Sequence, residues 1–384
     1  MRLCDIIEIK HGYAFSGDHI IEEDNNVVLV TPGNFRIGGG FQEKKCKFFN
    51  GDLPSDYILN EGDFIVTMTD LSKTIDTLGY SAIVPKSKNR IYLHNQRIGL
   101  VHFKNDICDR GYIYWLMRTR DYQRTIANTS TGSTVHHTSP SKIYDYEFKA
   151  PDKATQHRVA SILFHYDSLI DNYQKQIKLL EESAQCLYKE WFIDLRFPGH
   201  ENTKIVDGVP EGWEKKNLGD ITPIKTGKRD ANFGTADGEY PFFTCAQEPI
   251  KSPAYSFDTS AVILAGNGDF NVKLYRGKFE AYQRTYVLEP NDTNMLYLLF
   301  FCVLENMNRL ATGASGSTIK FLTKGMIESL DLYEPDVDTL FAFNKIVEPI
   351  QRQKENLSTQ IRHLTEARDR LLPKLMSGEV IVNR

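Results

Sequence analysis

Leu3-x-Asp5-Ile6-x-x-Ile9-Lys10-x-Gly12 decides the fold, because it returns as Leu218-x-Asp220-Ile221-x-x-Ile224-Lys225-x-Gly227. Further along, Gly132-Ser133-Thr134-Val135 returns as Gly316-Ser317-Thr318-Ile319. The shift of this second motif then holds to the end of the chain, where Leu187 is matched by Leu371. Repetition at a fixed spacing predicts two copies of one structural unit. We therefore expect a pseudo-two-fold molecule that grips something with two halves.

Length and composition agree with a soluble protein of two domains. The chain has 384 residues, 41% hydrophobic and 25% charged, with a formal net charge of −4, and a chain of this length usually divides into two cores. No apolar run is long enough to span a membrane, and the N-terminus does not have the pattern of a signal peptide. We expect a cytoplasmic protein. Its six cysteines are widely spaced, which predicts reduced thiols and no metal site.

Each copy has the pattern of a mixed α/β unit, with short β-type runs followed by a helical stretch. The predicted strands are 27–30, 63–66, 81–84, 98–101, 261–264 and 284–288, and the predicted helices are 112–127 and 293–310. The expected organisation is a globular domain over 1–150, a helical region over 151–196, a surface linker over 197–212, a second globular domain over 213–335 and a second helical region over 336–384.

Both helical regions carry apolar residues in two series with a spacing of seven, which is typical of a coiled-coil seam. About 35 helical residues span roughly 50 Å, and the two-fold repeat predicts that the helices run antiparallel. Lys354 and Arg368 interrupt one of the two apolar series in the second helical region, and we expect Pro349 to start or kink that helix. Two amphipathic helices, each lying on its own domain, remain the alternative. The predicted seam consists of Leu163, Tyr166, Ile170, Tyr173, Ile177, Leu180, Ala184, Leu187, Trp191, Val347, Ile350, Leu357, Ile361, Leu364, Leu371 and Leu375.

No motif for catalysis is evident. The chain lacks a Pro-Pro pair, which excludes the usual amino-methyltransferase motif, and Gly266-Asn267-Gly268-Asp269 predicts a tight loop rather than a nucleotide cradle. Glu43-Lys44-Lys45 and Glu147-Phe148-Lys149 match only the loose E-x-K pattern of some nucleases. His136-His137 favours a loop or partner contact over a metal ligand.

Recognition chemistry remains. Polar residues cluster in the loops beside the predicted strands, and Gln-Arg pairs occupy matching places in the two copies. Arginine and glutamine can pair bidentately with guanine and adenine in the major groove, whereas Ser, Thr and Lys suit phosphate. The same residues can instead form ordinary strand edges and turns. The candidates for DNA contact are Thr69, Asp70, Lys73, Gln96, Arg97, Ser133, Thr134, Asn267, Asp269, Asn271, Lys273, Gln283, Arg284, Ser317, Thr318 and Lys320.

Further stretches resemble the specificity subunits of type I restriction–modification enzymes. They are Leu187-Tyr188-Lys189-Glu190-Trp191-Phe192-Ile193-Asp194, Arg196-Phe197-Pro198-Gly199-His200-Glu201, Val209-Pro210-Glu211-Gly212-Trp213 and Leu371-Leu372-Pro373-Lys374-Leu375-Met376-Ser377-Gly378-Glu379-Val380. These stretches occur in the order typical of that family, and the resemblance covers the full chain. Met1 falls almost at the first repeat motif, without the Pro-Glu-Gly-Trp lead-in that precedes the second. The resemblance therefore does not fix the edge of the first domain.

The resemblance implies two target recognition domains, each reading one half of a bipartite double-stranded DNA target. It implies that the helices set the gap and dock two modification subunits, and that restriction subunits then join. S-adenosylmethionine, ATP and Mg would act on those partners, so this chain is expected to hold no cofactor and to be non-catalytic. No base-contacting residue carries over.

Three other hypotheses remain open from the residues. The chain could serve another multi-subunit restriction enzyme, act alone as a nuclease or methyltransferase, or form a coiled-coil scaffold that does not bind DNA. Turnover by the purified chain, and retardation of DNA by the chain with its partners, separate these hypotheses from the first.

Overall fold

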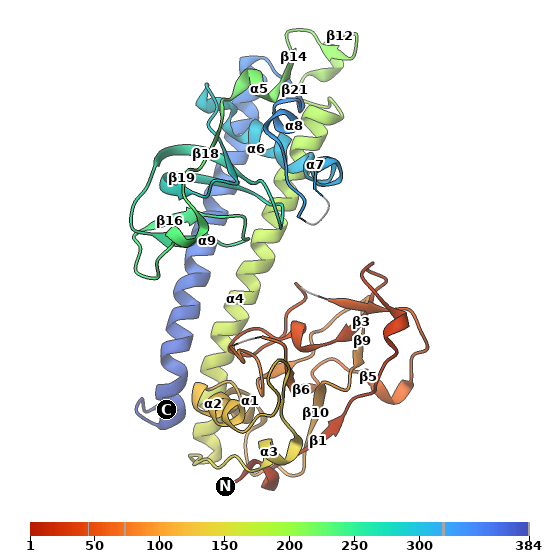
Figure 1. The fold of residues 1–384 in the computed structure, drawn as a ribbon, viewed down its shortest axis with the longest axis vertical. Coiled ribbons are helices and arrows are strands. Elements are labelled where there is room, and N and C mark those ends of the chain that lie inside the picture. The colour runs from red at the N-terminus through yellow and green to blue at the C-terminus, as the bar shows by residue number, and fades with distance from the viewer. Residues whose placement is uncertain (45, 73, 317–318, 383–384) are drawn as a thin grey trace. The chain divides into compact units, whose positions relative to one another are not determined.

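The computed structural model describes residues 1–44, 46–72, 74–316 and 319–382. The chain divides into two compact units (Figure 1). Unit 1 consists of Met1–Asn172 and Gln360–Arg384, and unit 2 of Tyr173–Thr359. This division differs from the domain boundaries expected from the sequence, because each long helix contributes one end to each unit.

The described part of unit 1 contains two main sheets. One has the strand order β1-β10-β6-β8, and the other has the order β2-β4-β3-β9-β5. A short ladder also joins β7 and β11. The bounds are β1 Ile7–His11, β2 Ile20–Ile21, β3 Val27–Val30, β4 Lys47–Phe49, β5 Ile58–Leu59, β6 Phe64–Thr67, β7 Thr69–Asp70, β8 Ser81–Ile83, β9 Ile91–His94, β10 Ile98–Phe103 and β11 His136–His137.

The central strand β6 carries apolar residues on both faces, because each face covers a different core. Phe64 and Val66 belong to the core shared with the helices, and Ile65 belongs to the core shared with the second sheet. Successive strand residues point to opposite faces. A continuous apolar run is therefore expected of a strand that is buried on both sides.

The helical stretch predicted over 112–127 is two helices, α1 (Arg110–Leu116) and α2 (Arg120–Asn128). The break falls at Thr119, whose hydroxyl accepts a hydrogen bond from Tyr122 N and so caps the start of α2. The short helix α3 (Pro140–Tyr144) follows. The prediction of one helix was wrong because apolar spacing alone does not detect an internal cap.

In the described part of unit 2, the main sheet has the order β15-β20-β18-β19-β16-β17. Val262 and Leu264 of β18 face the helices, and Ala261 and Ile263 face a second apolar cluster, so this strand matches β6. The bounds are β12 Ile205–Val206, β13 Val209–Pro210, β14 Glu214–Asn217, β15 Ile224–Thr226, β16 Tyr240–Phe243, β17 Ile250–Ser252, β18 Phe257–Ala265, β19 Val272–Ala281, β20 Thr285–Leu288 and β21 Asp331–Glu334.

The helices of unit 2 follow the same plan with different lengths. The helical stretch predicted over 293–310 is divided into a 3₁₀ turn (Thr293–Met295), α6 and α7. The bounds of the helices are α5 Leu218–Ile221, α6 Leu296–Glu305, α7 Met307–Gly313 and α8 Lys324–Glu328. The expected surface linker contains the hairpin β12–β13, and its Phe197 packs on Trp213 with ring centroids 4.5 Å apart.

The two long helices are α4 (Lys153–Tyr188), which continues as a π-helical turn over Lys189–Ile193, and α9 (Val337–Ser377). Equivalent aspartates begin them: Asp152 accepts from Thr155 N, and Asp336 accepts from Thr339 N. Pro349 lies inside α9 and does not start it. Capping, rather than the proline, therefore sets where the second helix begins.

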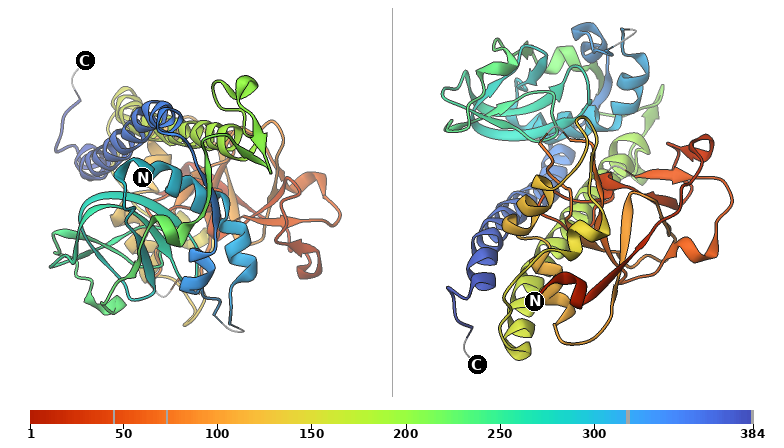
Figure 2. Two further views of the ribbon diagram at one scale, coloured as in Figure 1. Left: turned by 90° about the horizontal axis from the view of Figure 1, so that it is seen from above. Right: turned by 60° about the horizontal axis from the view of Figure 1, so that its bottom comes forward.

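Within each unit the two long helices lie side by side (Figures 1 and 2). In unit 1 the beginning of α4, at Val159 and Leu163, shares a core with the end of α9, at Leu372 and Leu375. In unit 2 the beginning of α9 shares a core with the end of α4. The residues that repeat those of unit 1 are Phe343, Val347, Tyr188 and Trp191. Since beginnings meet ends, the helices pair antiparallel, and the predicted fold class is confirmed.

Candidate nucleic-acid interface

The first Gln-Arg pair lies in the tight turn between β9 and β10. Asn95 is buried, its side-chain oxygen accepts from Arg97 N at 3.0 Å, and its carbonyl accepts from Ile98 N at 2.9 Å. Gln96 N donates to the carbonyl of Tyr13 at 2.9 Å. These bonds fix the backbone, while the side chains of Gln96 and Arg97 are exposed. The turn therefore presents both side chains to solvent from a rigid support.

His94 supports this turn from inside the core. It is 1% exposed, and its Nε2 lies 2.9 Å from the carbonyl oxygen of Ile98. Burial lowers the pKa of His94 to about 4, although the bond to Ile98 opposes that shift. The ring is thus neutral near pH 7 and donates from Nε2 to the carbonyl. It positions the turn without adding charge to it.

The second Gln-Arg pair lies in the matching turn between β19 and β20. Thr285 N donates to the carbonyl of Tyr282 at 2.8 Å, and Gln283 N donates to the carbonyl of Arg229 at 3.0 Å. Gln283 and Arg284 are exposed. The two copies thus hold the pair by the same backbone bonds, although the preceding residue is Asn95 in one and Tyr282 in the other.

Glycines allow the strand that opens each copy to approach this turn. An added Cβ on Gly12 would lie 2.2 Å from the carbonyl oxygen of Asn95, and on Gly227 it would lie 1.9 Å from that of Ala281. A real side chain cannot fit at such distances. These glycines end the two repeat motifs recognised in the sequence, so close backbone approach accounts for glycine at both positions.

A second loop joins each turn through the same pair of hydrogen bonds. In unit 1, Met68 N donates to the carbonyl of Arg97 at 2.9 Å, and Thr138 N donates to the carbonyl of Met68 at 3.0 Å. In unit 2, Gly266 N donates to the carbonyl of Arg284, and Leu322 N to that of Gly266, both at 2.8 Å. We call this assembly of loops around the Gln-Arg turn the loop cluster. Each unit has one.

The glycine that opens each copy of the repeated Gly-Ser-Thr motif belongs to the same cluster. Gly132 and Gly316 adopt φ of 103° and 105°, and the nearest atoms to an added Cβ would be the carbonyl oxygens of Val135 and Ile319. Thr131 pairs with His137, as Ser315 pairs with Phe321. Glycine at this position is therefore a requirement of the loop's conformation. Ser133, Thr134 and Lys320 are exposed.

Thr69 and Asp70 are corrections to the predicted contacts. Their side chains are 3% and 2% exposed. The Asp70 carboxylate accepts from Ser72 N and Thr77 N, both at 2.6 Å, and from Leu78 N at 3.0 Å. Burial raises the pKa of Asp70, but the hydrogen bonds from Ser72 and Thr77 outweigh it and lower the pKa below its usual value. Asp70 organises the loop over 70–78 rather than facing a ligand.

In the corresponding loop of unit 2, the polar side chains form hydrogen bonds within the loop. Lys273 donates to the carbonyl of Ala246 at 3.0 Å and to the side chain of Asn271, while Asp269 accepts from Gln247 at 2.8 Å. Burial lowers the pKa of Lys273. Asn267 is half-buried. The candidates Lys73, Ser317 and Thr318 lie outside the described residues.

Arg97 and Arg284 differ from these engaged side chains. Within residues 1–44, 46–72, 74–316 and 319–382, neither guanidinium group has a hydrogen-bond or ion-pair partner, whereas Gln283 donates to Asp230 at 2.8 Å. Two exposed arginines without partners, on equivalent rigid turns, are well suited to bind an external acceptor such as a base edge.

The predicted seam residues are all buried or half-buried. Two charged groups that the sequence pattern took as interruptions pair across the seam instead. Lys354 lies 2.9 Å from Glu181, and Arg368 lies 2.5 Å from Asp167. Asp167 also accepts from Arg118 at 2.6 Å. Arg118 and Asp167 were not predicted from the sequence as members of this ion-paired group. Asp167 lies on the same face of its helix as the apolar seam, and that position was a signal that could have identified it.

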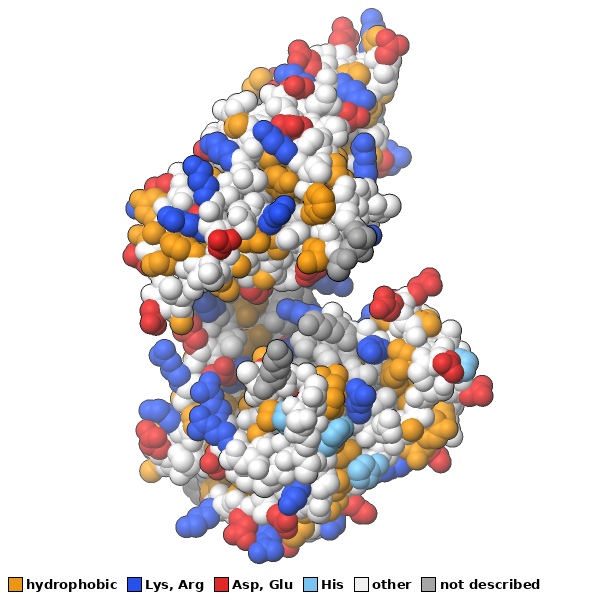
Figure 3. Space-filling view, in the orientation of Figure 1, with side chains coloured by type: hydrophobic (Ala, Val, Ile, Leu, Met, Phe, Trp, Pro, Cys, Tyr) orange, Lys and Arg blue, Asp and Glu red, His pale blue; other side chains and the backbone are white. Residues whose placement is uncertain are grey.

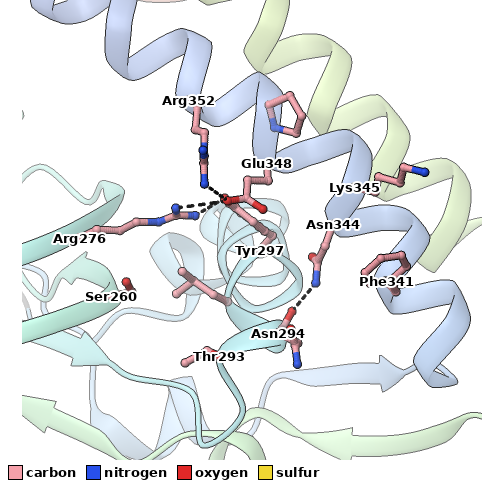
Figure 4. A pocket seen from close by; sticks show the side chains of 12 residues that line it. Ser260, Arg276, Thr293, Asn294, Tyr297, Phe341, Asn344, Lys345, Glu348 and Arg352 are labelled. Atoms are coloured by element: carbon pink, nitrogen blue, oxygen red, sulfur yellow. Dashed lines mark hydrogen bonds and ion pairs between the residues drawn. The ribbon is translucent and has the colours of Figure 1, made fainter.

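A cavity of about 740 Å³ lies in unit 2 against α9, apart from the loop cluster (Figure 4). Arg276 and Arg352 converge there on Glu348, and Asn344 donates to the carbonyl of Asn294 at 2.8 Å. The matching hollow of unit 1, about 390 Å³, is lined by Phe64, Phe103, Tyr114 and Phe164 among others. Among the described residues, the backbone bonds of the loop cluster recur in both units, whereas the two cavities differ in volume and in the residues that line them.

The described ranges hold no group of three or more His, Cys, Asp or Glu residues placed to bind a metal, and no helix long and apolar enough to cross a membrane. Glu43 is bound by Arg90 and Glu147 by Arg2, so both E-x-K triplets have their acids in ion pairs. Basic and acidic side chains are interspersed over the drawn face of each unit (Figure 3).

Comparisons with known proteins agree with a chain built from two similar units. The profile of the family described as type I restriction modification DNA specificity domain matches residues 1–182 and 210–361. The EcoDI specificity subunit of Escherichia coli is 40% identical over 178 residues, which cover 45% of this chain and 39% of that protein. The MjaIX specificity subunit of Methanocaldococcus jannaschii is 28% identical over 313 residues, covering 73% of this chain and 72% of that protein.

A solved structure supports the same fold. The S subunit of a type I restriction–modification system from M. genitalium superposes with a TM-score of 0.60 at 16% identity, over 98% of this chain and 95% of that one. The chain therefore belongs to the family of type I restriction–modification DNA specificity subunits, and it carries the family's domain twice.

Proposed function

We propose that each loop cluster reads one half of a bipartite double-stranded DNA target. The observation that carries this proposal is the recurrence of an exposed Gln-Arg turn, held by the same backbone bonds, in two units of otherwise different loops. Arginine bidentate to guanine is the commonest specific contact in the major groove, and glutamine pairs with adenine in the same way. Because the surrounding loops differ, the two halves of the target have different sequences.

The paired helices set the gap between the half-sites and dock two modification subunits, to which restriction subunits are added. S-adenosylmethionine, ATP and Mg belong to those partners, and this chain supplies recognition and assembly in the cytoplasm. Basic and acidic side chains are mixed on the surface, and the net charge is −4. Much of the contact with DNA phosphates must therefore come from a local face of this chain or from the partner subunits. The names of the relatives, specificity subunits of restriction enzymes, support the same assignment.

Replacing Arg97 with alanine is expected to relax the target at one base pair of one half-site. A bidentate arginine–guanine pair contributes about 1–3 kcal/mol of discrimination. Arg284→Ala should relax one position of the other half-site, with the gap unchanged in both variants. The measurement is a map of methylated bases in DNA from cells that express the chain with its modification subunits.

Exposed arginines on helices serve as matched controls for these variants. Arg124 on α2 and Arg309 on α7 are exposed, and their alanine variants should leave the methylated motif intact. If Arg97→Ala and Arg284→Ala instead lower methylation of every sequence equally, the two arginines contact phosphate and do not read bases. Methylation by the purified chain alone, supplied with S-adenosylmethionine, would contradict the proposed division of labour.

A further inference from the structure

The seam between α4 and α9 contains two ion pairs, one in each unit. In unit 1, Asp167 and Arg368 are 17% and 11% exposed and 2.5 Å apart. In unit 2, Lys354 is 16% exposed and lies 2.9 Å from Glu181, which is 53% exposed. In both pairs the anion is on α4 and the cation on α9. The charges of the seam thus distinguish one helix from the other.

Both ion pairs belong to one antiparallel register. Asp167 and Glu181 are two heptads apart on α4, and their partners Arg368 and Lys354 are two heptads apart in the opposite direction on α9. The pairs are therefore not isolated surface contacts. Each unit pairs the helices in the same residue register.

The internal repeat shows what stands at the matching places. Asp167 corresponds to Gln351 and Arg368 to Ala184, so two uncharged residues occupy the positions that match the first ion pair. Glu181 corresponds to Thr365 and Lys354 to Ile170, so the second ion pair also has an uncharged counterpart. Gln351, Ala184 and Ile170 are buried. Each ion pair therefore occurs once in the chain.

The other seam positions do not tell the copies apart, because they are apolar in both. The matching residues are Leu163 and Val347, Tyr166 and Ile350, Tyr173 and Leu357, Ile177 and Ile361, Leu180 and Leu364, Leu187 and Leu371, and Trp191 and Leu375. Apolar residues at these matching positions do not by themselves distinguish α4–α9 pairing from pairing of like helices. Within the two apolar series, the pairs Ile170 and Lys354, and Ala184 and Arg368, have a charge in one copy and an apolar residue in the other.

Pairing of like helices in this register leaves the seam charges without opposite partners. Between two α9 helices, Arg368 meets Gln351 and Lys354 meets Thr365. Arg368 then keeps only Asp369, whose side chain is 58% exposed. A buried charge that loses its partner is strongly destabilising, and polar groups in a seam are known to specify register and partner choice.

We propose that these two ion pairs make the seam selective for its own α4–α9 pairing, so that the chain does not assemble with second copies of itself through like helices. The surface on each long helix then fits one partner, the other helix, and excludes an identical one. This inference concerns how the helices choose each other, and it does not depend on which DNA sequence is bound.

A full-length variant in which the seam charges are replaced by the residues of the matching positions tests the proposal. Glu181→Thr, Lys354→Ile and Arg368→Ala combined remove three of the four seam charges and both ion pairs, while Asp167 stays to balance Arg118. We expect wild type to sediment as a single chain, and the variant to self-associate at least about tenfold more strongly, which corresponds to 1.4 kcal/mol or more. Circular dichroism verifies that its helices remain. A folded variant that stays as monomeric as wild type overturns the proposal.

A charge exchange gives a second measurement that does not depend on the folding of the triple variant. Glu181→Lys places two cations in the seam and should lower the melting temperature, and adding Lys354→Glu should recover most of the loss. Glu182→Lys, which disrupts only the exposed pair with Lys178, is the matched control and should change little. If the exchange is no more stable than Glu181→Lys alone, the pair does not align the helices and the proposal fails.

Discussion

Asp167→Ala is expected to lower the free energy of unfolding by about 3–5 kcal/mol, because it leaves two buried cations without their carboxylate. Arg118 is 2% exposed and donates to Asp167 from the side of the first globular copy, while Arg368 donates from α9. Arg118 also stacks over Trp115, with its guanidinium carbon 4.1 Å from the ring centroid, and donates to the carbonyl of Gly38. It cannot turn away to reach water without breaking these contacts.

A neighbouring aspartate on α4 provides a matched control. Asp171 lies one turn after Asp167 and pairs with Arg36 at 3.3 Å, but its side chain is 49% exposed. Asp171→Ala should therefore cost less than about 1 kcal/mol, as expected of a surface ion pair. Denaturant unfolding of both variants gives the comparison. Equal losses in the free energy of unfolding would mean that the buried carboxylate of Asp167 stabilises the fold no more than the exposed one of Asp171.

The contribution of Asp167 is also expected to disappear in acid. Burial raises the pKa of Asp167, but Arg118 and Arg368 outweigh it and hold the pKa below its usual value. A carboxyl with a depressed pKa stabilises the folded state fully above its unfolded pKa, about 3.9, and loses that effect as pH falls through its folded pKa. The stability difference between wild type and Asp167→Ala should be constant from pH 7 to about 5 and shrink below about 4. A difference that shrinks already between pH 7 and 6 would contradict this.

The large-scale plan of the molecule could be predicted from the sequence because it is periodic. A motif that returns at a fixed shift predicts two similar units, and a seven-residue spacing over forty or so positions predicts long paired helices. The strands at 27–30 and 98–101 were also predicted, since β-branched runs between turn residues are local signals. Features of this kind depend on residues close together in the chain.

The ion-paired group of Arg118, Asp167 and Arg368 could not be predicted in the same way, because its members are far apart in the chain. Arg368 and Asp167 are separated by 201 positions, and Arg118 comes from the junction between α1 and α2. A charged residue at an apolar position of a heptad reads as a defect until its partner is known. Tertiary structure, not local pattern, decides whether such a residue weakens the seam or aligns it.

The loop clusters show a similar limit. Asp70 and Arg97 both lie in polar loops beside strands, yet Asp70 is 2% exposed and receives backbone hydrogen bonds, whereas Arg97 is exposed. Polarity alone does not separate a side chain that builds a loop from one that the loop presents. The repeat does help, because Gln96-Arg97 and Gln283-Arg284 occupy the same turn in both units. Matching positions in the two copies therefore indicate which polar side chains are exposed better than polarity alone does.

Removing one turn from both long helices is expected to shorten the gap in the DNA target while both half-sites stay the same. The segments to delete are Gln174–Ile177 of α4 and Ser358–Ile361 of α9, which correspond to each other in the repeat and lie between the two ion pairs of the seam. Because the same length leaves both helices, Asp167 can still meet Arg368 and Glu181 can still meet Lys354. The apolar positions on either side continue at spacings of three and four.

The expected size of the change follows from helix geometry. Four residues correspond to about 6 Å along a helix and a net rotation of about 40°. DNA rises about 3.4 Å per base pair along each strand and turns once in about 10.5 base pairs. The gap should therefore shorten by about one to two base pairs. Mapping of methylated bases in cells that express the variant with its modification subunits measures it directly.

Two further variants separate a change of length from a loss of structure. Deleting Gln174–Ile177 alone shifts one end of α4 against α9, so the two ion pairs cannot both form in one register, and this variant should lose stability and methylation together. Gln174→Ala with Lys175→Ala changes exposed residues of the same turn at constant length, and it should leave the gap as in wild type. If the double deletion methylates both half-sites at an unchanged gap, the helices do not measure the distance. The spacing must then be set by the partner subunits or by bending of the DNA, because α4 and α9 would be the wrong length for the site that is still recognised.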